Sequence, residues 1–248
     1  MADTSDTRLR ILGIFAHPDD AEFTCGGSAA IWSEQGAEIT YVIVTNGAAG
    51  SNDPNQDLDE LVRVREAEQR AACAVLGVQE VIFLGRPDGT LQPTIELRRE
   101  LTRIIRRLKP DRVVTGDPTG VFYGDGYINH PDHRAAAEAA IYAVFPSAVT
   151  RPIFPELLAE GYEPHQVKEV YISVEDAHAN TFVDISSALD RKIEALRCHK
   201  SQLDPGDGQW IRDWAAETGK AGNVAYAEAF RVMKLVGKED PQSSTTQA

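Results

Sequence analysis

The chain has 248 residues, 42% of them hydrophobic and 25% charged, with a formal net charge of −13. This composition is ordinary for a soluble globular protein. The acidic balance argues against nucleic acid or an anionic membrane surface as a partner, because either would need a basic footprint. No uninterrupted apolar run reaches 18 residues, and the N-terminal MADTSDTRLR lacks a secretory pattern, so we expect neither a membrane span nor a signal peptide. The three cysteines, Cys25, Cys73 and Cys198, are widely spaced, which favours the reducing cytoplasm.

Short apolar runs alternate with amphipathic stretches along the chain. The pattern predicts strands at 10–16, 38–45, 80–84 and 112–116, each followed by a helix, at 26–35, 58–76, 94–108 and 131–145. Later strands are predicted at 169–175 and 181–185, before a helix at 186–198. The strands lack strict polar alternation, which is typical of burial on both faces. We therefore expect a mainly parallel sheet covered by helices, in the doubly wound α/β class.

In such a sheet, ligands bind beyond the carboxyl ends of the strands. The segments leaving those ends are AHPDD, NGAAGSNDPNQD, GRPDG and DPTGVFYGDGYINHPDH. The second and fourth are long, since such loops usually run about 2–6 residues. Long polar loops at one edge of the sheet predict the entrance of a substrate-binding site there. The tract SQLDPGDGQW at 201–210 is either a further lid over that site or an oligomer contact.

The motif HPDD at 17–20 is echoed by HPDH at 130–133. Proline is tolerated in the first turn of a helix, and side chains three positions apart share a face, so His17 can converge with Asp20, and His130 with His133. If both helix starts lie at one sheet edge, these groups surround a single small volume. Two histidines and one carboxylate suit a catalytic Zn²⁺ with a position left for water. The same set also serves Fe²⁺, so spacing alone leaves the metal open.

Each motif also has a purely structural explanation. An aspartate in the first helical turn complements the helix dipole, and a single HPD is a common turn opener. Two such openers, each with a second ligand-type residue three positions on, favour the metal site. Asp19 and Asp132 are then spare carboxylates, and one of them can take a proton from a bound water.

Other candidates carry weaker signals. Arg65 either forms a surface ion pair with Glu68 or reaches a ligand hydroxyl. His165 and His178 are assigned structural or surface roles, and His199 stays open. A solvated helix face is predicted for five arginines at helical spacing, namely Arg98, Arg99, Arg103, Arg106 and Arg107.

Six segments together resemble the PIG-L or LmbE-like deacetylases, which include N-acetylglucosaminyl-phosphatidylinositol de-N-acetylases and the deacetylases of mycothiol and bacillithiol synthesis. The matching text runs in family order from residue 10 to about 202 and comprises AHPDDAEFTCGG, TNGAAGSND, RVREAEQRAACAVLG, FLGRPDG, GYINHPDHRAA and HKSQ. The resemblance implies a Rossmann-like three-layer α/β/α fold, one zinc per subunit and a homo-oligomer. We expect a single domain over 9–237, with flexible ends at 1–8 and 238–248.

The resemblance also implies roles for named residues. The metal ligands would be His17, Asp20 and His133, with Asp19 as general base and a protonated His130 as electrostatic or acid partner. Four residues are assigned to substrate binding, namely Arg65, Asn129, Asp132 and His199. The chain departs from the family text AHPDDE by placing Ala21 before Glu22, which leaves the subfamily and substrate open.

The expected reaction is removal of an N-acetyl or other N-acyl group from an amino sugar or related small glycoconjugate by a zinc-bound water. Two alternatives remain: an amidase acting on a thiol or other non-sugar conjugate, and a metal-bearing binding domain without turnover. An iron oxygenase is disfavoured but would be distinguished by its need for oxygen.

Overall fold

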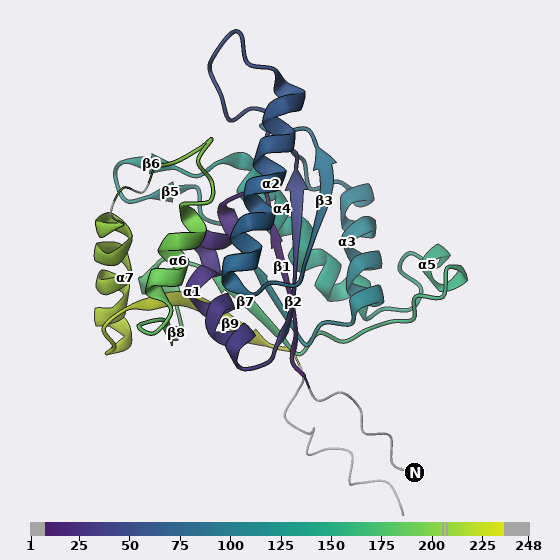
Figure 1. Ribbon diagram of the computed structural model, residues 1–248. Coiled ribbons are helices and arrows are strands. Elements are labelled where there is room, and N and C mark those ends of the chain that lie inside the picture. The colour runs from purple at the N-terminus through teal and green to yellow at the C-terminus, as the bar shows by residue number, and fades with distance from the viewer. Residues whose placement is uncertain (1–7, 205, 207, 236–248) are drawn as a thin grey trace, which may run out of the picture.

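The computed structural model describes residues 8–204, 206 and 208–235. A seven-stranded sheet forms its centre, in the order β3-β2-β1-β4-β7-β9-β8 (Figure 1). The strands are β1 (Arg10–Phe15), β2 (Glu38–Thr45), β3 (Glu80–Arg86), β4 (Arg112–Thr115), β7 (Glu169–Ser173), β8 (Thr181–Asp184) and β9 (Ala227–Lys234). All pairings from β3 to β7 are parallel, and β9 runs antiparallel to both β7 and β8. The expected mainly parallel sheet is confirmed.

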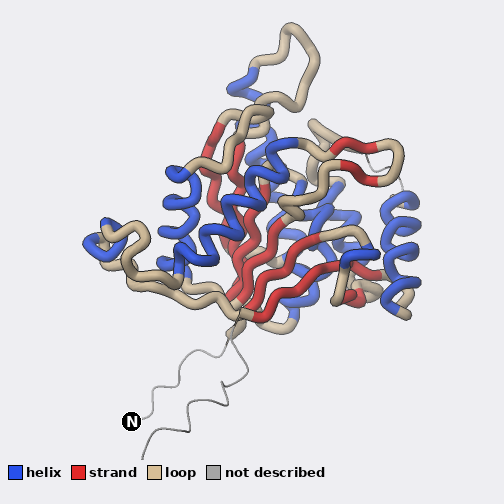
Figure 2. Tube along the Cα trace, turned by 180° about the vertical axis from the view of Figure 1, so that it is seen from behind, coloured by secondary structure: helices blue, strands red, loops and turns tan. Residues whose placement is uncertain are grey.

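Helices cover both faces of this sheet (Figures 1 and 2). One face packs against α1 (Asp20–Glu34), α2 (Leu58–Leu76) and α6 (Leu189–Leu196), and the other against α3 (Ile95–Leu108), α4 (Pro131–Tyr142) and the π-helical turn η1 (Ala143–Ala148). The chain also forms α5 (Glu156–Ala159), η2 (Asp176–His178) and α7 (Gln209–Gly222), which packs on β8 and β9. A small hairpin joins β5 (Phe122–Tyr123) to β6 (Tyr127–Ile128).

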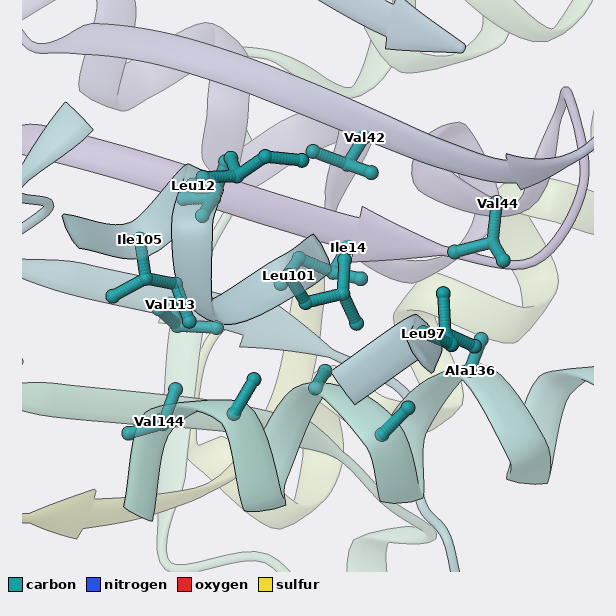
Figure 3. Packing of buried hydrophobic residues seen from close by; sticks show 14 of the residues in the cluster. Leu12, Ile14, Val42, Val44, Leu97, Leu101, Ile105, Val113, Ala136 and Val144 are labelled. Carbon is teal, nitrogen blue, oxygen red and sulfur yellow. The ribbon is translucent and has the colours of Figure 1, made fainter. Parts of the chain in front are cut away.

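The core follows the two-residue period of the strands. In β1, Leu12 and Ile14 point toward α3 and α4, where Ile14 lies among side chains such as Leu101 (Figure 3). Ile11 and Phe15 point to the opposite face, toward α1 and α2. Both faces of β1 are therefore buried, which explains why its sequence reads as one apolar run.

The order of the strands creates a switch point beside β1. From β1 the chain winds outward to β2 and β3, and later strands β4 and β7 extend the sheet in the opposite direction. Such a point leaves a crevice at the carboxyl ends of the two diverging strands. The HPDD loop leaves β1 there, and the loop that carries HPDH leaves β4, so the fold itself brings the two motifs to one edge.

Helix α1 starts earlier than predicted, at Asp20 rather than Gly26. Cys25 has non-helical dihedral angles (φ −146°, ψ 22°) and divides α1 into two parts. The carboxylate of Glu228 accepts hydrogen bonds from the backbone N–H groups of Gly27 (2.9 Å) and Ser28 (2.8 Å), as a cap would. The sequence pattern therefore detected the second part, and the first is a separate turn that carries Asp20.

Arg106 contradicts the prediction of a fully solvated arginine face. Its side chain is completely buried, and its guanidinium donates hydrogen bonds to four backbone carbonyls, those of Ser147, Ala148, Thr150 and Ile153. The segment after α4 closes over α3 and needs a donor for these carbonyl groups, since buried backbone acceptors must be paired. Helical spacing cannot reveal such a partner.

The end of the chain also differs from the prediction. The tract 201–210 leads directly into α7, and neither α7 nor β9 was predicted. The helix after β8 begins at Leu189 instead of Ser186. Within the described part, no helix has the length and apolar character needed to cross a membrane. Residues 1–7 and 236–248, which include most of the ends predicted to be flexible, fall outside the described residues.

Candidate active site

The HPDD motif forms a strained turn that α2 holds in place. Asp19 has a φ of 101°, in the left-handed region that residues other than glycine rarely adopt. Its backbone N–H donates to Gln69 Oε1 (2.9 Å). Arg65 Nη2 donates to the Pro18 carbonyl (2.8 Å) and to Asp19 Oδ2 (3.2 Å). The turn folds Asp20 back on His17, whose backbone N–H donates to Asp20 Oδ2 (2.8 Å).

His17, Asp20 and His133 meet at the switch point. Asp20 Oδ2 lies 3.4 Å from His17 Nδ1, and Asp20 Oδ1 lies 3.1 Å from His133 Nε2. The three side chains offer ligand atoms that all lie within 4.8 Å of one another. Ligands bonded at about 2.1 Å to a tetrahedral zinc lie about 3.4 Å apart, so these residues fit a single divalent cation.

Two further carboxylates lie beside the other ring nitrogen of His17. His17 Nε2 lies 3.0 Å from Asp88 Oδ1 and 3.5 Å from Asp132 Oδ2. Although burial alone would lower the pKa of His17, the carboxylates of Asp20 and Asp88 raise it to about 10. The cluster therefore attracts positive charge. A carboxylate on the far nitrogen of a ligating histidine is also the usual support of metal sites.

Asp88 was missed at the sequence level. It follows β3 in the text GRPDG, so a Pro-Asp pair follows the strand here as it does in the two HPD motifs. That repetition was the available signal. Its Oδ2 atom also accepts a hydrogen bond from the backbone N–H of Ala49 (2.9 Å), which links the loop after β2 to the site.

Asn129 orients His133. Asn129 Oδ1 lies 2.9 Å from His133 Nδ1, and Asn129 Nδ2 donates to the Gly120 carbonyl (2.9 Å). The amide oxygen therefore selects the tautomer with hydrogen on Nδ1, which leaves the Nε2 lone pair of His133 facing Asp20. Both polar ends of Asn129 are thus engaged by the protein, rather than free for substrate as expected.

His130 lies beside the cluster, with its ring centroid 4.7 Å from that of His17. Its Nδ1 atom accepts a hydrogen bond from the backbone N–H of Asp132 (3.2 Å), at the start of α4. Burial, together with the neighbouring His17, lowers the pKa of His130. These contacts favour a neutral ring with its hydrogen on Nε2, and not the protonated form that was expected.

Asp19 has the environment of a base. Burial and the adjacent Asp20 raise its pKa to about 7, while Arg65 opposes the shift. Its side chain is 15% exposed, and Arg65 contacts one carboxylate oxygen. A carboxylate with a pKa near the operating pH is suited to accept and return a proton.

Two residues expected to contact substrate, Arg65 and Asp132, are buried supports instead. Arg65 holds the Asp19 turn and is 4% exposed, and its expected surface pair with Glu68 is absent from the contacts described here, since Glu68 binds Ser201. Asp132 is fully buried and accepts from the backbone N–H groups of Gly89 and Leu91. Direct substrate contact is therefore corrected for Arg65 and Asp132, because both side chains are buried and hydrogen-bonded to backbone groups of the protein.

His199 lies beneath the turn, out of reach of the crevice. It is fully buried, and its Nε2 atom is 3.1 Å from Glu22 Oε2. Glu22 Oε1 in turn accepts a hydrogen bond from Gln69 Nε2 (2.9 Å), and Gln69 Oε1 accepts one from the backbone N–H of Asp19. His199 thus belongs to a buried series of hydrogen-bonded side chains that ends at the backbone of Asp19, the candidate base. Its assignment to substrate binding is corrected.

Comparison with known proteins agrees with this geometry. The profile of the PIG-L family, described as GlcNAc-PI de-N-acetylase, matches residues 12–144. The diacetylchitobiose deacetylase of Thermococcus kodakarensis is 32% identical over 227 residues, which cover 90% of this chain and 82% of the relative. The 1D-myo-inositol 2-acetamido-2-deoxy-alpha-D-glucopyranoside deacetylase of Actinosynnema mirum is 31% identical and covers 89% of this chain and 90% of its own length.

A solved structure extends the likeness to the fold. The N,N'-diacetylchitobiose deacetylase from Pyrococcus horikoshii superposes with a TM-score of 0.82 at 30% identity, over 91% of this chain and 84% of that chain. The matched family region spans β1 through α4 and includes every residue of the HPDD and HPDH motifs. The chain belongs to the PIG-L family of deacetylases.

Proposed function

We propose that this protein is a metal-dependent hydrolase that removes the N-acetyl group of an amino sugar. The observation that carries the proposal is the meeting of two imidazoles and one carboxylate beside a carboxylate whose pKa lies near 7. A binding domain without turnover needs a metal site but has no use for such a base. The related deacetylases act on amino-sugar derivatives by name, which supports the same class of substrate.

We propose zinc as the cation, held by His17, Asp20 and His133. The donor set of two nitrogens and one carboxylate suits zinc in a catalytic site, although Fe²⁺ accepts the same set. A bound divalent cation supplies the charge that polarises an acyl oxygen and makes a water more acidic. Asp88 and Asn129 orient the two imidazoles, so that each presents one nitrogen to the site.

The remaining chemistry falls to two side chains. Asp19 accepts the proton of the attacking water and returns it to the leaving amine. Arg65 keeps its carboxylate in position, and Gln69 accepts a hydrogen bond from its backbone N–H. His130 donates from Nε2 to the acyl oxygen as negative charge develops there. A neutral imidazole with its hydrogen on Nε2 can act as this donor, and one such donor typically contributes about 10²–10³ in rate. The two adjacent aspartates have different roles, with Asp20 as ligand and Asp19 as base, because a carboxylate that binds a metal tightly cannot also accept the proton.

Reconstitution with metal tests the proposal. Protein stripped with a chelator and reloaded with zinc should release acetate and free amine from N-acetylglucosamine derivatives, and the stripped protein should not. Asp19→Asn should keep its zinc and lose about 10²–10⁴ in kcat. The exposed Asp59 of α2 supplies the control Asp59→Asn, which should behave as the parent.

Two outcomes would contradict the proposal. Full activity of Asp19→Asn would reject Asp19 as the base. Release of a larger acid from a thiol conjugate, with no acetate from any amino sugar, would favour the amidase alternative.

Compartment and assembly remain predictions. We propose a cytoplasmic homo-oligomer, supported by three free cysteines and by the family resemblance. Sedimentation of the purified protein should give a mass above the 27.1 kDa of one chain.

A further inference from the structure

Three fully buried polar side chains lie beneath the HPDD turn. They are Glu22 of α1, Gln69 of α2 and His199, which follows α6 in the HKSQ motif. We call them the support network (Glu22, Gln69 and His199). Burial of polar side chains is unfavourable unless they are hydrogen-bonded to one another or to the backbone, so the partners of these three indicate what the network holds.

The cavity that opens from the metal cluster is lined by other residues. Its volume is about 1000 Å³, which is sufficient for a small-molecule substrate. Asp20 and His133 line it at the cluster, and Trp210 and Trp214 of α7 form part of its wall. No member of the support network is among its described lining residues. The network can therefore affect the chemistry only through another residue.

That residue is Asp19. Gln69 Oε1 accepts a hydrogen bond from the backbone N–H of Asp19 (2.9 Å), and Gln69 Nε2 donates one to Glu22 Oε1 (2.9 Å). A carboxylate only accepts hydrogen bonds, so Glu22 directs the NH₂ end of the Gln69 amide toward itself and the amide oxygen toward Asp19. The other oxygen of Glu22 lies 3.1 Å from His199 Nε2, which fixes the position of the carboxylate.

The HKSQ turn at 199–202 is itself attached to α2. The backbone N–H and the hydroxyl of Ser201 donate to the two carboxylate oxygens of Glu68, at 2.8 Å and 2.6 Å. Glu68 directly precedes Gln69 in α2, and α2 and α6 pack against each other. Helix α2 therefore anchors the support network at the end that carries Gln69 and at the end that carries His199.

Asp19 needs such a support because its backbone is strained. Its φ of 101° lies in the left-handed region that side chains other than glycine disfavour. With this conformation, Asp20 lies against the imidazoles of His17 and His133, while the adjacent Asp19 pairs with Arg65. In a regular helix or strand, neighbouring side chains do not face the same point. The strained turn is therefore what brings both carboxylates to one site.

We propose that Gln69, oriented by Glu22 and His199, is the positioning residue that keeps Asp19 and Asp20 in their separate roles as base and metal ligand. The proposal rests on the function proposed above and gives the HKSQ motif a role in the reaction. Without the acceptor of Gln69, Asp19 relaxes toward a more common backbone conformation, which displaces both carboxylates. A displacement of about 1 Å can cost about 10²-fold in rate.

Gln69→Leu tests the positioning role, because it removes both hydrogen bonds with a side chain of similar size. At saturating zinc, kcat for acetate release from an N-acetylglucosamine derivative should fall about 10–100-fold, and KM should change less than about threefold. The affinity for zinc, measured by chelator competition without substrate, should fall about 10-fold because Asp20 moves as well. The control Gln92→Leu, at an exposed position, should leave all three quantities unchanged.

An exchange of two side chains separates positioning from a general loss of stability. Gln69→Glu alone places two carboxylates against each other in a buried position and should lower kcat. In the double variant Glu22→Gln/Gln69→Glu, the carboxylate at position 69 accepts from the Asp19 N–H and from the amide at position 22, whose oxygen accepts from His199. The double variant should recover most of the lost kcat, compared on the plateau of each pH–rate profile.

The possible outcomes separate the two proposals. A folded Gln69→Leu with the kcat and zinc affinity of wild type overturns the positioning role. A folded double variant that is no more active than Gln69→Glu also overturns it, and this comparison decides if circular dichroism finds Gln69→Leu unfolded. Absence of acetate release from any amino sugar overturns the proposed function, whereas the zinc affinities still test the positioning role because they need no substrate.

Discussion

Asp88 offers the sharpest test of how the site holds its metal. Its Oδ1 atom lies 3.0 Å from His17 Nε2, and its side chain is 6% exposed. The carboxylate of Asp88 fixes the ring of His17 and increases the basicity of His17 Nδ1, the nitrogen that faces Asp20. Asp88→Ala removes both effects. Loss of such a partner typically lowers metal affinity about 10–100-fold. Because Asp132 Oδ2 stays 3.5 Å from the same nitrogen, we expect the smaller effect, about 10-fold or about 1.4 kcal/mol.

Competition with a chromogenic chelator measures this affinity for zinc directly. The zinc affinity of Asp88→Asn should lie between the affinities of wild type and Asp88→Ala. Asp88 uses one carboxylate oxygen toward His17 and the other toward the Ala49 N–H, whereas the amide of asparagine has an acceptor oxygen at only one of these two positions. Asp59→Ala, on the exposed first turn of α2, is the control for loss of one negative charge.

Stability separates a metal effect from a folding effect. Asp88→Ala also loses the hydrogen bond from Ala49, which contributes about 1 kcal/mol, so the chelated variant should still unfold cooperatively near the wild-type midpoint. A zinc affinity within about twofold of wild type, in a variant with normal stability, would refute the inferred support of His17.

Three more variants test other parts of the structure. Burial raises the pKa of Asp19 to about 7 and Arg65 opposes this shift, so Arg65→Met should raise that pKa further. Since the base works only when deprotonated, the acidic limb of the pH–rate profile should move to higher pH, and an unmoved limb would count against the contact. His130→Phe should lower kcat about 10²–10³-fold with zinc content unchanged, measured by acetate release and elemental analysis; normal turnover would exclude His130 as a donor. Arg106→Met leaves buried carbonyls unpaired and should lower the free energy of unfolding by about 3 kcal/mol in urea titrations, whereas the exposed Arg107→Met should change it by less than about 0.5 kcal/mol.

Local spacing was sufficient for the main features of the site. The proline after His17 and after His130 marks two helix starts, and the three-residue spacing puts both members of each pair on one face. The structure brings His17, Asp20 and His133 together as this pattern predicted. The apolar runs likewise predicted the parallel strands, because a strand buried on both faces has no room for polar alternation.

Partners from distant segments could not be predicted in this way. Asp88 supports His17 only because β3 and β1 end at the same edge of the sheet, and a Pro-Asp pair in a loop does not reveal which histidine it will face. His199 and Arg106 looked like open or solvated positions, yet both are fully buried against segments far away in the chain. Burial depends on which surfaces the sheet order brings into contact.

The sequence by itself therefore indicated the kind of site: the histidines and aspartates that can bind a cation, the two spare carboxylates Asp19 and Asp132, and the ends of the strands that carry them. Those properties depend on residue type and on spacing within a few positions. Only the tertiary structure decided the supports of these residues and the shape of the cavity, including the place of Trp210 and Trp214 on its wall. The physical reason is that helical and strand periods act over a single element, whereas burial, pKa shifts and cavity walls arise from contacts between elements.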